Sequence, residues 1–285
     1  MSNRFKVDKY GRKHVYGLSF NQPIPSTEIF KIGQESVFPV IITLNDRSIG
    51  NGSAFIYKQL IYDNYSYLFF LTNLHVIQGI HDAIPILSQN ENVNIKLLLR
   101  FKDKDIEINE VYLTKDIYFD FAGDKTGFYS QFDFAVFKIR IDTTEIFDFF
   151  SIKEERNFQE GDKVYALGYP QGLNLSISDG IISHIYNEDE EFLTKENETL
   201  AKNFIQHNIL INHGNSGGPT VNEYGNIVGI STKGIEQQIA VGINYSLNIY
   251  HILKFLENPE YLEKFRVQEF MNFIKNEFQK IKSLS

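Results

Sequence analysis

The most informative stretch of the chain is Asn212-His213-Gly214-Asn215-Ser216-Gly217-Gly218-Pro219. A serine between glycines can occupy a tight turn in which larger neighbours would clash. Such a turn can aim two backbone N–H groups at one point, as an oxyanion hole requires. Ser216 is therefore a candidate nucleophile, and the N–H groups of Gly214 and Ser216 are candidate donors. A glycine-rich loop can also cradle phosphate, but no helical pattern follows Pro219 and a Walker-type lysine is absent.

A serine hydroxyl is a weak nucleophile near neutral pH and needs a positioned base. His75 lies where the strongly apolar segment 68–77 ends, which makes it a candidate base, although a lone histidine there is more often structural. A third group must hold the imidazole, and a desolvated carboxylate does this. Asp133 opens an apolar segment and fits that role. Three acids in a looser loop are weaker candidates: Asp116, Asp120 and Asp124.

Short apolar segments separated by Gly, Asn and Asp lie on both sides of the serine loop. Many short strands at regular spacing indicate an all-β barrel or sandwich. The segments divide into two six-stranded halves with a boundary around residues 142–160. The predicted strands are 37–44, 53–57, 67–72, 93–101, 106–113, 132–141, 163–168, 176–185, 204–211, 218–221, 227–231 and 239–243.

The chain changes character near Leu247, where apolar residues begin to recur at helical spacing. The sequence Asn258-Pro259-Glu260 interrupts this pattern, which then resumes. We therefore divide the chain into an N-terminal extension (1–34), a main domain (35–250) and a C-terminal helical extension (251–285). The helices of the tail either pack on their own barrel or bind a partner.

Composition narrows the classes of function. The 28 basic and 36 acidic residues give a formal net charge of −8, which argues against a general nucleic-acid-binding surface. The chain has no cysteine, which excludes disulfides, cysteine nucleophiles and thiolate metal sites.

No segment of about 18 apolar residues occurs, so we expect no membrane span. The N-terminus lacks a secretory pattern, so we expect a cytoplasmic protein. The acidic segment 186–203 is expected to be a solvated loop.

Five groups of segments follow the order seen in a known family. They are 52–56 with 71–77, 133–139, 166–172 with 180–183, 204–219, and 225–230. Each group alone is a weak to moderate signal, but their shared order and the order His, Asp, Ser make it strong. Over roughly residues 35–250 the chain resembles the trypsin-like (chymotrypsin-fold) serine proteases, nearest to the bacterial HtrA/Deg branch.

This resemblance implies two six-stranded antiparallel β-barrels with the site in the crevice between them. It implies that His75 is the general base, that Asp133 orients it and that Ser216 attacks the substrate carbonyl. The N–H groups of Gly214 and Ser216 then bind the oxyanion, and an acyl-enzyme forms. The implied function is a serine endopeptidase that hydrolyses protein or peptide substrates without a metal or cofactor.

The resemblance also places the primary specificity pocket. Its base falls near Leu210, and its walls fall near Ile230, Ser231, Thr232, Gly242 and Ile243. No acid lies at the base, which disfavours a preference for Arg or Lys, and an apolar lining rewards the burial of apolar surface. We therefore expect a small or medium aliphatic P1 residue.

Few residues of this sequence follow the predicted barrel, so we expect a departure from the HtrA/Deg pattern in the form of a missing PDZ domain. The helical tail is therefore a candidate docking site for a regulatory protein, and a homo-oligomer is a further alternative because that branch often forms trimers. Two other functions stay open. One is a latent cytoplasmic protease that a partner activates, as a regulatory or defence effector. The other is a non-catalytic binding module on a protease scaffold.

Overall fold

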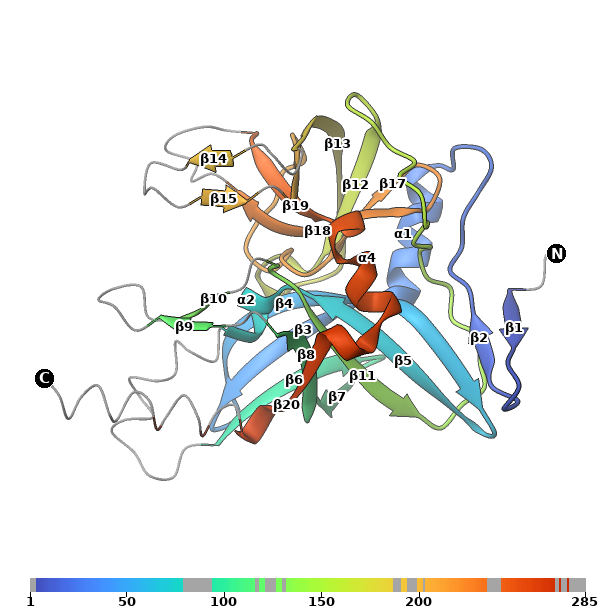
Figure 1. The fold of residues 1–285 in the computed structure, drawn as a ribbon, viewed down its shortest axis with the longest axis vertical. Coiled ribbons are helices and arrows are strands. Elements are labelled where there is room, and N and C mark those ends of the chain that lie inside the picture. Colours follow the sequence, from blue (N-terminus) through green and yellow to red (C-terminus); the bar gives the residue numbers. More distant parts are fainter. Residues whose placement is uncertain are drawn as a thin grey trace, which may run out of the picture.

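The computed structural model places the strands in two main sheets, which lie one above the other in Figure 1, with helices packed against them. The residues that it describes are 4–78, 94–115, 118–120, 127–129, 132–186, 191–193, 199–201, 203–234, 242–269, 272 and 276. The acidic run at 188–190, the acids Asp116 and Asp124, most of the predicted strand 239–243 and most of the tail after residue 269 lie outside these ranges.

The N-terminal half forms a ten-stranded antiparallel sheet. Its hydrogen-bonded order is β20-β8-β11-β5-β4-β3-β6-β7, with β2 paired to β4 and β1 paired to β2. The bounds are β1 (Phe5–Val7), β2 (Lys13–Val15), β3 (Val37–Leu44), β4 (Arg47–Tyr62), β5 (Tyr65–Thr72), β6 (Ile95–Phe101), β7 (Lys104–Glu107), β8 (Glu110–Thr114), β11 (Ala135–Ile141) and β20 (Leu262–Arg266).

The expected first barrel is not seen as a clearly closed one in the described part of this sheet. Within the described ranges its order ends at β7 on one side and β20 on the other, so no closed six-stranded barrel is seen. At one end of the order, β20, from the C-terminal tail, pairs with β8 from Leu262↔Thr114 to Arg266↔Glu110. The helix expected over 262–266 is therefore wrong, because the edge of β8 offers this segment a ladder of backbone hydrogen bonds.

The C-terminal half forms the predicted closed six-stranded barrel, in the order β12-β13-β16-β19-β18-β17. Its strands are β12 (Lys163–Gly168), β13 (Ser176–Ile185), β16 (Phe204–His207), β17 (Pro219–Asn222), β18 (Ile227–Gly234) and β19 (Asn244–Asn248). Two short hairpins stand apart from both sheets, β9 (Tyr118–Asp120) with β10 (Gly127–Tyr129) and β14 (Glu191–Leu193) with β15 (Thr199–Ala201). The second of these hairpins belongs to the segment that was expected to be a solvated loop.

The predicted bounds are confirmed for β3, β12 and β13. The predicted strands 53–57 and 67–72 are too short, because β4 covers Arg47–Tyr62 and β5 covers Tyr65–Thr72. The chain reverses between them at Asp63, whose φ is +50°. Two single-turn helices, η3 (Pro170–Gly172) and η4 (Pro259–Tyr261), complete the connections.

Two longer helices pack into the hydrophobic core between the two sheets. Helix α1 (Ser26–Ser36), in the stretch predicted only as an extension, buries Ile29 and Ile32 there. Helix α4 (Ile249–Glu257) buries Ile249 and Ile252 in the same core, and it passes between the barrel and β20 in Figure 1. The predicted helical start at Leu247 is wrong because that residue pairs with Phe204 in the barrel.

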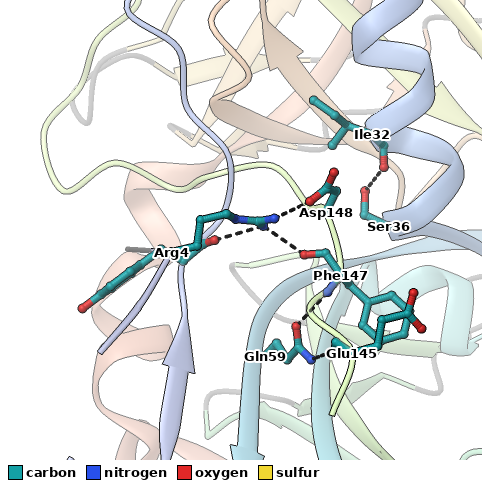
Figure 2. Close-up of polar contacts among 8 residues, drawn as sticks. Arg4, Ile32, Ser36, Gln59, Glu145, Phe147 and Asp148 are labelled. Atoms are coloured by element: carbon teal, nitrogen blue, oxygen red, sulfur yellow. Dashed lines mark hydrogen bonds and ion pairs between the residues drawn. The ribbon is translucent and has the colours of Figure 1, made fainter. Parts of the chain in front are cut away.

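The linker between the two sheets is held by polar contacts, which Figure 2 shows. The fully buried side chain of Gln59 donates to Glu145 O (2.7 Å) and accepts from Phe147 N (3.1 Å). Arg4 pairs with Asp148 and donates to Phe147 O (2.9 Å). Arg4 of the N-terminal extension and Gln59 of the first sheet therefore both hold the linker in place.

Within the described ranges, no helix has the length and apolar character that a bilayer span requires.

Inside the barrel, His207 is fully buried, with its Nε2 atom 2.9 Å from Ser246 Oγ. Burial lowers the pKa of His207 to about 4, from 6.5. Its folded pKa therefore lies below its unfolded pKa, so the unfolded chain binds the proton first as the pH falls from 6.5 towards 4. Stability is retained above pH 6.5 and is lost through this window.

We expect the free energy of unfolding to be lower at pH 5 than at pH 7.5 by about 2 kcal/mol through His207 alone. Urea unfolding of the wild type and of His207→Gln at both pH values measures this contribution. The variant should be less stable overall but should show a flatter pH dependence. An equal pH dependence in both proteins would show that His207 is not buried in its neutral form.

Candidate active site

The register of the first sheet brings His75 and Asp133 together. His75 is in helix α2 (Leu74–Gln78), which starts just after β5 ends, and Asp133 lies two residues before β11. Strands β5 and β11 are antiparallel neighbours, with Ala135 opposite Thr72. As a result, His75 Nδ1 donates to Asp133 Oδ2 (2.7 Å) and the backbone N–H of His75 donates to Oδ1 (3.0 Å).

The carboxylate of Asp133 accepts a further hydrogen bond from the second half of the chain. Thr232, on β18, donates through Oγ1 to Asp133 Oδ2 (2.5 Å). Burial works against ionisation of Asp133, but the charge and hydrogen bonds of His75 and the hydroxyl of Thr232 outweigh it. They hold the pKa of this carboxyl below its usual range, so Asp133 stays charged and fixes the His75 tautomer.

The loop of Ser216 joins β16 to β17 and needs two glycines in the left-handed region. Gly214 has φ +97° and Gly217 has φ +85°. A Cβ atom at Gly217 would lie 2.1 Å from Ser53 O, so the backbones approach too closely there for any side chain. The peptide N–H of Gly217 donates to Ser231 O (2.9 Å), and Ser231 N donates to Gly218 O (2.9 Å).

Ser53, a fully buried residue of β4, fixes this loop from the other sheet. Its hydroxyl donates to Gly214 O (2.7 Å) and accepts from Tyr169 N (3.0 Å). Its backbone N–H donates to Ser216 O (2.8 Å). These contacts occupy the carbonyl groups of the loop. The N–H groups of Gly214 and Ser216, by contrast, have no acceptor among the described residues.

The hydroxyl of Ser216 donates to Thr232 O (3.1 Å). Within the described ranges, no hydrogen bond joins it to His75. Thr232 therefore contacts both ends of the predicted triad, Ser216 through its carbonyl and Asp133 through its hydroxyl. The three predicted residues lie in one cluster, in which the serine points to Thr232.

The residues predicted for the specificity pocket have different environments. Leu210 is 62% exposed, and Gly242 and Ile243 are partly exposed. Ile230 and Ser231 are fully buried, the first in the core between the sheets. Residues 235–241, which precede two of these positions, are outside the described ranges, and the assignment of the pocket stays a prediction.

Two residues of the site were not foreseen in these roles. The sequence predicts Thr232 only as a wall of the specificity pocket. It gives Ser53 no role beyond its place in the segment 52–56, which resembles the family. The small residues at 52–54, inside an otherwise apolar strand, are the signal that could have marked Ser53 as a place of close backbone approach. In the described part of the chain, no three His, Asp or Glu side chains are grouped to hold a metal ion.

Residues 52–230 match the family model of the trypsin-like peptidase domain. The chain therefore belongs to the trypsin-like peptidase family. Its relatives include the serine endoprotease DegS of Haemophilus influenzae, 30% identical over 77% of this chain and 57% of DegS. The Do-like serine protease HtrA of Bacillus subtilis is 29% identical over 71% of this chain and 37% of that protein. The chain thus spans about half the length of these relatives.

Solved structures support the fold. The HtrA-type protease AlgW, solved with a tripeptide, superposes with a TM-score of 0.55 at 22% identity, covering 82% of this chain and 63% of AlgW. The serine endoprotease of Yersinia pestis gives a TM-score of 0.51 at 22% identity, covering 83% of this chain and 67% of the other.

Proposed function

We propose that this protein is a serine endopeptidase in which Ser216 is the nucleophile, His75 the general base and Asp133 its orienting carboxylate. The observation that carries the proposal is the hydrogen-bonded cluster of His75, Asp133, Thr232 and Ser216, which joins residues from both halves of the chain. Membership of the trypsin-like peptidase family supports the same reaction.

In the proposed reaction, the Ser216 side chain rotates away from Thr232 O and donates to His75 Nε2. His75 takes the proton as Ser216 Oγ bonds to the scissile carbonyl carbon, and Asp133 stabilises the imidazolium. The free N–H groups of Gly214 and Ser216 stabilise the negative charge on the carbonyl oxygen. His75 then protonates the leaving amine as the C–N bond breaks. Water hydrolyses the acyl-enzyme by the same steps, and Ser216 regains its proton.

The substrates proposed are proteins or peptides with a small or medium aliphatic P1 residue, because the predicted pocket carries no acid at its base. We propose no nucleic-acid or membrane partner. A regulatory partner at the C-terminal tail, a homo-oligomer and a cytoplasmic location stay predictions.

A fluorophosphonate probe tests the proposal, because it reacts with an activated serine beside a formed oxyanion hole. We expect the purified native protein to become labelled, and mass spectrometry should place the label on Ser216. Heat-denatured protein is the control and should stay unlabelled. A label on another residue, or none even after addition of cell lysate, would contradict the proposed function and leave a binding module on a protease scaffold.

A second candidate is a latent protease that a partner switches on. The observation that favours it is the hydrogen bond from Ser216 Oγ to Thr232 O in place of one to His75. In that case labelling and cleavage of an unfolded protein should appear only when lysate is added. Labelling by the purified protein alone would exclude latency.

A further inference from the structure

A chain of buried polar side chains crosses the inside of the C-terminal barrel. His207 Nε2 is 2.9 Å from Ser246 Oγ, which is 2.6 Å from Thr220 Oγ1, which is 3.0 Å from Ser231 Oγ. All four residues are fully buried. They come from β16, β19, β17 and β18, so the chain ties four of the six strands together. We call it the His207–Ser231 chain.

Such a chain is a costly way to fill a barrel. Each hydroxyl and the imidazole must give up hydration, and apolar residues of similar size would avoid that cost. The gain from a hydrogen-bonded polar chain is a defined geometry, because its hydrogen bonds form in only one arrangement. Of its polar side-chain atoms, only Nδ1 of His207 has no partner among the described residues. The position of the His207–Ser231 chain shows which part of the molecule it holds in place.

The Ser231 end lies against the catalytic loop. The backbone of Ser231 bonds in both directions to this loop, accepting from Gly217 N and donating to Gly218 O. The next residue, Thr232, contacts both Asp133 and Ser216.

The strand is irregular at this point. The pairing of β18 with β19 shifts register between Ser231 and Lys233, so Thr232 lies at a bulge. The ladder alone fixes a bulged residue less firmly than a paired one. The hydrogen bond between Ser231 Oγ and Thr220 Oγ1 supplies a restraint that the backbone hydrogen bonds of the strand do not provide here.

We propose that the His207–Ser231 chain is a positioning device for the catalytic centre. By fixing Ser231 from inside the barrel, it holds the bulged Thr232 where its hydroxyl supports Asp133 and its carbonyl lies beside Ser216. His207, Ser246 and Thr220 act only through Ser231 and Thr232 and do not touch the substrate. This inference rests on the proposed function.

The test is Thr220→Val, which removes the central hydroxyl but keeps the side-chain shape. The matched control is Thr43→Val, because Thr43 is buried in the first sheet and its hydroxyl has no partner in the described part of the chain. We expect Thr220→Val to lower kcat by about 10- to 100-fold with KM unchanged. Thr220→Ser, which restores a hydroxyl, should recover most of the loss. Thr43→Val should match the wild type in both constants.

A second readout does not depend on turnover. The low-field proton resonance of His75 Nδ1–H reports the hydrogen bond to Asp133, and it should shift in Thr220→Val and in Ser246→Ala. Ser36→Ala is the control for the latter, because Ser36 is a buried serine that bonds to Ile32 O in α1. If the resonance stays unchanged in Thr220→Val and Ser246→Ala, the inference is overturned. A wild type that neither labels nor cleaves, even after addition of cell lysate, would contradict the proposed function, while the resonance would still decide this inference.

Discussion

Ser216→Ala is expected to lower kcat for cleavage of an unfolded protein by about 10⁶-fold. The substitution removes only the hydroxyl that forms the acyl-enzyme and leaves the turn at Gly214 and Gly217 in place. The substitution loses one hydrogen bond, to Thr232 O, so thermal unfolding should change little. Steady-state cleavage and thermal unfolding of both proteins measure the two effects.

Ser48→Ala is the control for this loss, because Ser48 is exposed on β4. It should cleave at the wild-type rate. A Ser216→Ala protein that retained the wild-type rate would remove Ser216 from the proposed mechanism.

Asp133→Asn is expected to lower kcat by about 10⁴-fold. The carboxylate accepts hydrogen bonds from His75 N, His75 Nδ1 and Thr232 Oγ1. An amide has one acceptor atom and a donating NH₂ group, so it cannot accept all three. It forces His75 towards the tautomer that carries its proton on Nε2, and that tautomer cannot take a proton from Ser216.

The control for this charge removal is Asp105→Asn. Asp105 pairs with Arg100 at the surface of the first sheet, where an ion pair contributes little to stability and nothing to the reaction. Its kcat should equal that of the wild type. Equal activity of Asp133→Asn and wild type would remove Asp133 from the proposed mechanism.

Strands with strong local patterns could be predicted from the sequence. The β-branched run of β3 and the segments of β12 and β13 have the bounds that composition and turn residues indicate. Local pattern could not show that β20 would pair with β8, because the helical spacing of the tail fits a helix until an open sheet edge is available. Helix α1 was missed for a similar reason, since its apolar face finds partners only in the core between the two sheets.

In the candidate site, too, local sequence indicated some features and not others. His75, Asp133 and Ser216 each follow a motif, so their residue types and order were readable. The contacts that join them were not, because they depend on groups far apart in sequence. Thr232 lies 99 residues from Asp133, and Ser53 lies 161 residues from Gly214. No local pattern encodes such contacts.

The position of Ser53 has a consequence for how activity arises during folding. Ser53 of the first sheet bonds to two carbonyls of the loop that presents Ser216, Gly214 O and Ser216 O, and this loop belongs to the second half. Without the first half, the turn lacks these two hydrogen bonds. We expect a molecule whose first half is missing or unfolded to carry Ser216 without Ser53 and without His75. The proposed protease would therefore become reactive only after its two halves have docked, which would protect the cell from incompletely folded molecules.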